Sequence, residues 1–161
     1  MIRAMKKEEI HDCVRVIRTA FATVADEFGF TAENAPRFTA FATNEERLWW
    51  HLEQEKRPMF VYCEEGQIVG YYSLAMLKDG NMELNNLAVV PSCRHRGIGD
   101  ALLKHSFEEA KKRNCPVMKI GIVEENKVLR RWYERYGFVH TGTEKFDFFP
   151  FTCGYLQKEL K

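Results

Sequence analysis

The sequence predicts an α+β fold in which helices cover both faces of a mixed, mostly antiparallel central sheet. Three observations predict it: strand-like and helix-like segments alternate, three consecutive strands are separated by tight turns, and a strand, helix, strand, helix order follows them. We expect about six to seven strands and about four helices. With 161 residues, the chain has the length of one domain with one sizeable core, expected to span residues 1–161.

The first third of the chain has the periodicity of amphipathic helices. Apolar residues recur at helical intervals over 10–28, and Gly29 marks the end of this helix. A second helix is expected from Thr43 to about residue 56, because Thr43 and Glu46 have the spacing of a capping box. The segment between the two helices is expected to contain loop and a short helix.

The middle of the chain predicts three consecutive antiparallel strands. Residues 60–63 and 68–77 are rich in β-branched and aromatic side chains and flank a short turn, which indicates a hairpin. The pair Asp79-Gly80 is a strong turn signal and leads into a third strand, 82–90.

The second half returns to alternating helices and strands. An apolar stripe over 98–110 predicts a third long helix, and the nearly continuous apolar run 117–123 predicts a buried strand that pairs in parallel with an earlier one. The tail, 138–146 and 151–160, alternates enough for two more strands. Between 117–123 and the tail, a fourth helix ends at Gly137 and is expected to share one apolar face. That face consists of Val128, Leu129, Trp132, Tyr133 and Tyr136.

The composition argues against several classes of function. With 24 Lys and Arg against 23 Asp and Glu, the net charge is +1, so no nucleic-acid partner is expected. No apolar run approaches the roughly 20 residues of a membrane span, so we expect no membrane partner and a cytoplasmic location. The five cysteines are scattered and the five histidines form no ligand pair, so we expect reduced thiols and no metal.

A basic turn containing two glycines joins the strand 82–90 to the helix that follows it. Helix N-termini expose unpaired N–H groups, and glycine lets these amides approach an anion closely. Arg94 and Arg96 add charges that can hydrogen-bond phosphate oxygens. Gly97 and Gly99 lack the third glycine of a dinucleotide fingerprint, and no Lys-Ser/Thr pair follows as in a P-loop. The turn indicates an anion site, and the alternative is a plain tight turn with solvated arginines.

The turn and a downstream segment together resemble the two acetyl-coenzyme A motifs of the GNAT superfamily of N-acetyltransferases. The residues that carry the resemblance are Leu87-Ala88-Val89 followed by Arg94-x-x-Gly97-x-Gly99, and then Asn126, Tyr133 and Gly137-Phe138. The resemblance implies a sheet splayed between strands 82–90 and 117–123, acetyl-CoA as the acyl donor, and one N-acetyltransferase domain.

The resemblance also implies how the donor is held. Main-chain amides from Arg96 to Asp100 would bind the pyrophosphate, and the main chain at Leu87 and Val89 would pair with pantetheine as another strand does. The carboxylate of Asp100 would repel phosphate unless it points away. The candidate cofactor-binding residues are Leu87, Ala88, Val89, Arg94, His95, Arg96, Gly97, Ile98, Gly99, Asp100, Asn126 and Tyr133.

The position of Asn126 has further interpretations. Asn126 would bond to the cofactor, cap its helix, or do both. Leu129 stands three residues later, where the family commonly has a small residue, which puts the cofactor contact there in question.

Acyl transfer to an amine needs a neutral nucleophile and a proton donor for the departing thiolate. Deprotonating a lysine-like amine costs about 4.6 kcal/mol at about pH 7, against about 1.4 kcal/mol for an α-amine near pKa 8. By the resemblance, Glu83 is the base, directly or through water, and Tyr133 is the acid. The alternative interpretations have no catalytic role: Glu83 is then a solvated surface residue, and Tyr133 is a core residue. Asn85 and Asn86 are predicted to orient water or substrate, or to form a bulge.

The resemblance places the acceptor against 29–43 and 146–155, two segments rich in phenylalanine. The preferred interpretation is that these rings belong to the core. The alternative is that they line an acceptor pocket or a subunit interface. The function predicted is transfer of acetyl from acetyl-CoA to a primary amine of a small molecule or peptide by direct attack. The alternatives are a CoA-binding regulatory or interaction module without turnover and a pure protein-interaction domain, and a homodimer is a further possibility.

Overall fold

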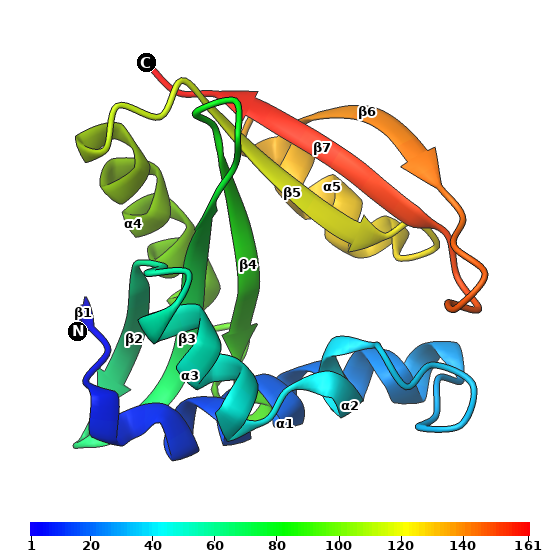
Figure 1. Cartoon of the computed structure of the whole chain (residues 1–161), viewed down its shortest axis with the longest axis horizontal. Coiled ribbons are helices and arrows are strands. Elements are labelled where there is room, and N and C mark those ends of the chain that lie inside the picture. The colour runs from blue at the N-terminus through cyan, green and yellow to red at the C-terminus, as the bar shows by residue number, and fades with distance from the viewer.

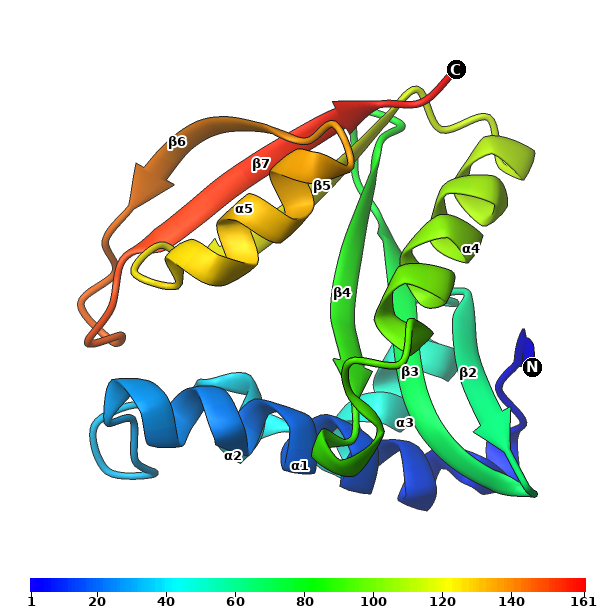
Figure 2. The same ribbon diagram turned by 180° about the vertical axis from the view of Figure 1, so that it is seen from behind.

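The structure, a computed structural model, describes all 161 residues and confirms the α+β class. One sheet of seven strands runs in the order β1-β2-β3-β4-β5-β7-β6. In Figure 1, α3 lies in front of the sheet and α1 runs beneath it, whereas α4 and α5 lie in front when the molecule is seen from behind in Figure 2. The sheet is therefore the middle layer of an α/β/α arrangement.

The element bounds agree closely with the predicted segments. The strands are β1 (Ile2–Ala4), β2 (Met59–Glu64), β3 (Gln67–Met76), β4 (Met82–Val89), β5 (Val117–Val123), β6 (Val139–Glu144) and β7 (Cys153–Glu159). The α-helices are α1 (Ile10–Phe28), α2 (Thr39–Ala42), α3 (Glu45–Glu53), α4 (Ile98–Lys112) and α5 (Lys127–Arg135). Four of these are the predicted helices, and α2 is a single turn within the segment expected to hold a short helix.

The start of α3 corrects the predicted capping box. Asn44 is the N-cap, and its side chain accepts a hydrogen bond from the main-chain N–H of Arg47 at 2.7 Å. The buried Thr43 hydroxyl instead donates to the carbonyl of Thr39 at 2.7 Å and closes α2. Because two helices meet at this point, the Thr43–Glu46 spacing predicted the cap one residue too early.

The predicted splay between β4 and β5 is confirmed. These two parallel strands pair only at Met82 with Met118 and at Glu83 with Lys119, and they diverge beyond that point (Figure 1). On its other edge, β4 pairs with β3 along its length, with a register shift where Asn86 adopts a φ of +56°. This shift is the bulge that was one interpretation of the paired asparagines.

The interior divides into two clusters of buried side chains. The larger has 30 members and lies around the sheet. The smaller consists of Ala25, Phe30, Ala35, Phe38, Ala40, Val123 and Phe151. This second cluster confirms that several of the phenylalanines are core residues.

The apolar face predicted for α5 needs one correction. Val128 is 76% exposed, whereas Tyr133 is buried and Leu129, Trp132 and Tyr136 pack against the main core. Val128 lies in the first turn of α5 and projects into the space that the splayed strands leave open. The five cysteines are all unpaired, and no helix is both long and apolar enough to cross a membrane.

Candidate active site

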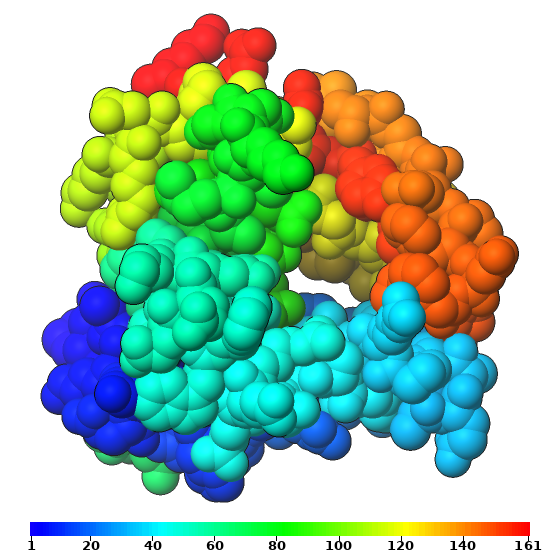
Figure 3. Space-filling view, in the orientation of Figure 1, coloured from blue at the N-terminus to red at the C-terminus, as the bar shows by residue number.

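The splay between β4 and β5 opens into a cleft of about 850 Å³. Its walls come from α1, β4, the turn before α4, β5, α5 and residues of the chain leading into β7. Figure 3 shows the opening between the α1–α2 region below and the strands above. A cleft of this volume suits a small-molecule ligand.

The predicted anion-binding turn forms one wall of this cleft. His95 (φ +63°) and Gly97 (φ +81°) are both left-handed, so the turn curls back before α4 begins. Gly97 is the N-cap of α4, and no side chain caps the free amides there. Unpaired amides and the helix dipole together make this end of α4 attractive to an anion.

The second glycine of the motif has a different role. A Cβ on Gly99 would meet the Trp132 ring at 3.8 Å and Val89 at 3.9 Å, which are ordinary contacts. Gly99 therefore avoids no internal clash, and its missing side chain leaves space between α4 and α5.

The two motif arginines are both engaged within the chain. The Arg94 guanidinium donates to the carbonyl of Ala20 and to the hydroxyl of Thr23, each at 2.9 Å, and to the carbonyl of Val89 at 3.3 Å. It thus ties the turn to α1. Arg96 forms an exposed ion pair with Glu64 at 2.7 Å and does not line the cleft. Contact of either guanidinium with phosphate stays a prediction, and the main-chain amides are the groups available to an anion.

The awkward carboxylate of Asp100 has a partner in α5. The Tyr136 hydroxyl donates a hydrogen bond to Asp100, and this bond is the main cause that raises the pKa of Tyr136 to about 12. The carboxylate is therefore held by α5, which lessens the repulsion expected at this position.

The edge of β4 that faces β5 supplies further main-chain groups. Leu87, Ala88 and Val89 line the cleft, and this stretch has no strand partner on the β5 side. Unpaired strand edges bind extended ligands through the same N–H and C=O groups that bind a neighbouring strand. Apart from the Val89 carbonyl, which accepts a hydrogen bond from Arg94, the edge is thus open to an amide-bearing chain.

Tyr133 is packed as a core residue and also lines the cleft. Its ring is packed edge-on against Trp132 and Phe138, with centroids 4.9 and 5.4 Å away. The residue also lines the cleft, its hydroxyl has no hydrogen-bond partner in the chain, and burial raises its pKa. The phenol is therefore held rigidly and stays protonated at neutral pH.

Asn126 caps α5, because its side chain accepts a hydrogen bond from the main-chain N–H of Leu129 at 3.2 Å. Both residues also line the cleft. The cap interpretation is confirmed, and the bulk of Leu129 narrows the cleft where a small residue was expected.

Glu83 lies on β4 beside Lys119 of β5 and is partly buried, so it is not an ordinary solvated glutamate. Burial raises the pKa of its carboxyl group, and Asn85, Arg57 and Lys119 oppose this shift. Glu83 is not on the cleft wall.

The sequence did not predict a group of buried polar atoms that have no hydrogen-bond partner. The hydroxyls of Tyr71 and Ser73 and the Nδ1 of His51 are buried without hydrogen-bond partners. Ser73 lies directly opposite Asn85 in the β3–β4 register, and burial is the largest cause that lowers the pKa of His51 to about 4. Buried polar atoms normally have hydrogen-bond partners, so these three atoms are available to a further polar group. The only sequence signal was one serine within an apolar strand.

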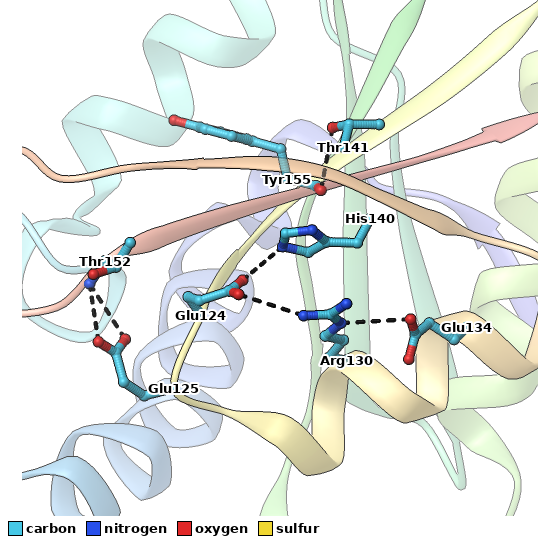
Figure 4. A network of polar contacts seen from close by, with 8 residues as sticks. All are labelled: Glu124, Glu125, Arg130, Glu134, His140, Thr141, Thr152 and Tyr155. Carbon is cyan, nitrogen blue, oxygen red and sulfur yellow. Dashed lines mark hydrogen bonds and ion pairs between the residues drawn. The ribbon is translucent and has the colours of Figure 1, made fainter.

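A polar network behind the cleft positions α5 (Figure 4). His140 and Glu124 approach at 2.9 Å, and Arg130 bonds to both Glu124 and Glu134 at 3.4 Å. A Cβ on Gly154 would lie 2.1 Å from the Glu124 carboxylate, so a larger residue there would force this side chain to move. The network links α5, the helix that carries Tyr133, to Glu124 and to His140 of β6. No group of three or more acidic, histidine or cysteine side chains is arranged to hold a metal ion.

The fold and cleft agree with comparisons against known proteins. The model of the acetyltransferase (GNAT) family matches residues 21–138. The chain belongs to the GNAT family. An uncharacterized N-acetyltransferase of Methanocaldococcus jannaschii is 30% identical over 95 residues, which cover 55% of this chain and 42% of that protein. This GNAT chain thus matches less than half the length of that relative.

Two solved structures share the fold of this GNAT chain over nearly its whole length. The PaiA N-acetyltransferase from Thermoplasma acidophilum, in complex with coenzyme A, has a TM-score of 0.84 and 17% identity, covering 99% of this chain and 98% of that one. The ribosomal-protein-S18-alanine N-acetyltransferase from Escherichia coli has a TM-score of 0.78 and 16% identity, covering 100% and 94%.

Proposed function

We propose that this GNAT protein transfers the acetyl group of acetyl-CoA to a primary amine of a small molecule or peptide by direct attack within a ternary complex. The observation that carries the proposal is one cleft that combines the uncapped N-terminus of α4, the unpaired edge of β4 and the free hydroxyl of Tyr133. The coenzyme A complex of the PaiA relative supports the choice of donor. Cytoplasmic location and a homodimer stay predictions.

The chain offers two sets of groups to the donor. The amides at the start of α4 would hold the pyrophosphate, and the main chain at Leu87 and Val89 would pair with the pantetheine amides. Both sets are main-chain groups on rigid elements, so they need no reorganisation when the donor enters. Acetyl-CoA supplies the thioester, and no metal is required for this chemistry.

The acid is Tyr133 and the base is Glu83. As the amine nitrogen forms its bond to the acetyl carbonyl carbon, the carbon–sulfur bond breaks and the thiolate takes a proton from the Tyr133 hydroxyl. The ammonium proton passes to Glu83 through water, because Glu83 is off the cleft wall. Burial raises the pKa of Glu83, which brings the carboxylate closer to neutral pH and improves it as a base.

The roles of Tyr133 and Glu83 are tested by replacing each with a residue of similar shape that lacks the acid or base group. We expect Tyr133→Phe and Glu83→Gln each to lower kcat by about 100-fold, since general acid or base catalysis contributes about that much. The affinity for CoA, measured by calorimetry, should stay unchanged. Tyr62→Phe and Glu65→Gln, the same changes away from the cleft, are the controls. Unchanged turnover in both cleft variants would contradict the assigned roles.

The pH dependence sharpens the test of Glu83. Because its pKa is raised, the acid limb of kcat/KM is expected above the ordinary pKa of a glutamate, and Glu83→Gln should abolish this limb. The fold favours the protonated form, so this contribution to stability is present below the ordinary pKa and is lost as pH rises through the raised pKa. Glu83→Gln should therefore gain stability relative to the wild type as pH rises from the ordinary pKa of a glutamate through the raised pKa of Glu83.

A CoA-binding module without turnover is the second candidate, favoured by the position of Glu83 off the cleft wall. This candidate predicts thermal stabilisation by CoA of about 2.7 kcal/mol at a hundred times its Kd, without thiol release in the presence of any amine. Thiol release that depends on an added amine decides for the enzyme.

A further inference from the structure

The far half of the cleft, opposite the uncapped end of α4, has an apolar wall. It lies between α1 and α2 on one side and the end of β5 with the chain leading into β7 on the other. The apolar residues that line it are Phe21, Val24, Phe38, Val123, Phe149 and Phe151. We call this region the aromatic end. Its assignment as the acceptor site rests on the proposed function.

The aromatic end is preformed. The rings of Phe30, Phe38 and Phe151 pack with centroids 4.8 to 5.7 Å apart and join the segment after α1 to the segment before β7. Thr31 and Asn34 exchange two side-chain to main-chain hydrogen bonds at 2.8 and 3.1 Å, which fix the loop between them. Rigid rings of this kind bury the apolar part of a ligand at little cost in conformational entropy.

The charges at the aromatic end are few and unpaired. The Arg37 guanidinium lies 4.2 Å from the centroid of the Phe148 ring and forms no ion pair. Glu27 is the one acidic residue of this wall and also forms no ion pair, whereas Asp100 belongs to the donor end and is held by Tyr136. A polyamine or aminoglycoside needs several carboxylates, whereas this wall offers one carboxylate and one cation.

We infer that the acceptor is a free α-amino acid with a large apolar side chain. The side chain packs among the rings of the aromatic end, the carboxylate pairs with Arg37, and the α-amine faces the thioester. Arg37 lines the cleft, its guanidinium lies over the Phe148 ring, and its planar fork can form two hydrogen bonds to a carboxylate. The nitrogen–carbon bond of the amide forms, the carbon–sulfur bond breaks, and the ammonium proton leaves through Glu83, giving an N-acetyl amino acid and free CoA.

The experiment follows thiol release by the full chain with acetyl-CoA and a matched set of amines. L-Phenylalanine is compared with 2-phenylethylamine, which lacks only the carboxylate, with glycine, which lacks the apolar side chain, and with spermidine. We expect kcat/KM for phenylalanine to exceed each of the others by at least about tenfold, the size of one good ion pair or one buried apolar side chain.

Arg37 is tested with the same assay. Arg37→Gln should raise KM for phenylalanine by about tenfold and leave both its kcat and the kinetics of 2-phenylethylamine unchanged. Arg47→Gln, an exposed arginine on α3 outside this cleft, is the control and should change neither amine.

Several results would overturn the inference. They are equal or better turnover of spermidine, faster turnover of a peptide with N-terminal phenylalanine than of the free amino acid, and equal kinetics of phenylalanine and 2-phenylethylamine. If CoA binds in calorimetry and no amine among several chemical classes releases thiol, the transferase proposal itself fails. Turnover of some other amine class defeats only the amino-acid inference.

Discussion

The end of the cleft at the start of α4 presents main-chain amides on a turn that hydrogen bonds hold in place, whereas the aromatic end presents rings held by packing. Arg94 ties the turn before α4 to α1 through two hydrogen bonds and to the end of β4 through a third. At the aromatic end, Phe30, Phe38 and Phe151 join two distant segments by ring contacts. The difference teaches that one cleft can combine a wall built from main-chain groups common to any chain with a wall specified by its side chains.

The largest expected effect on stability comes from removing a ring at the aromatic end. Phe151 is 6% exposed, so Phe151→Ala should lower the free energy of unfolding by about 3 kcal/mol, as for other buried aromatic residues. For a chain of this size the thermal midpoint should fall by on the order of 10 °C. The folded variant should keep its affinity for CoA, measured by calorimetry, while its KM for the acceptor rises.

The matched control is Phe148→Ala, because Phe148 is 39% exposed. This change should cost less than about 1 kcal/mol, since less apolar area leaves water when the residue folds into place. Equal losses of stability in the two variants would show that the packed cluster does not hold the aromatic end together.

An intermediate effect is expected from the two arginines of the turn before α4. Arg94→Ala leaves acceptor groups on α1 and β4 without their donor and should cost about 2 kcal/mol, with weaker CoA binding because the turn loses its anchor. Arg96→Ala breaks only an exposed ion pair and should change stability by less than about 0.5 kcal/mol. Denaturant unfolding and calorimetry measure both, and a reversed order would mean that the turn is not anchored through Arg94.

The smallest expected effect separates backbone conformation from binding. Gly97 and Gly66 both have left-handed φ angles, +81° and +78°, and a Cβ on either meets no atom within 4 Å. Alanine at each should cost about 1 kcal/mol of stability through strain alone. Only Gly97→Ala should weaken CoA binding, by about tenfold, because the turn must shift the amides at the start of α4. Equal CoA affinity of the two variants would remove the amides from the donor site.

Much of the fold was readable because its signals are local. The helix 10–28 is set by apolar residues at helical spacing, and the hairpin after residue 60 by alternation and turn residues. The turn before α4 was equally readable, since Gly97 and the start of α4 are adjacent in the chain. Where two local signals competed, as at Thr43 and Asn44, the sequence placed the cap one residue early.

The directions of the site side chains were not readable in the same way. Arg94 carries a charge that indicates phosphate, yet its guanidinium points to α1, 71 residues earlier in the chain at Thr23. Glu83 is on the predicted strand and off the cleft wall, because the β3–β4 and β4–β5 pairings decide which face it occupies. Such outcomes depend on register and burial, which spacing along the chain does not contain.

By itself, the sequence determined the order of the elements, the turn that exposes the amides of α4, and the family. Periodicity, turn residues and short motifs act within a few residues of one another, so they are written directly in the chain. Only the tertiary structure decided the aromatic end, where Phe38 meets Phe151 and Arg37 is left without an ion pair. Contacts between segments more than a hundred residues apart arise from packing the whole sheet and its helices, and no local pattern specifies them.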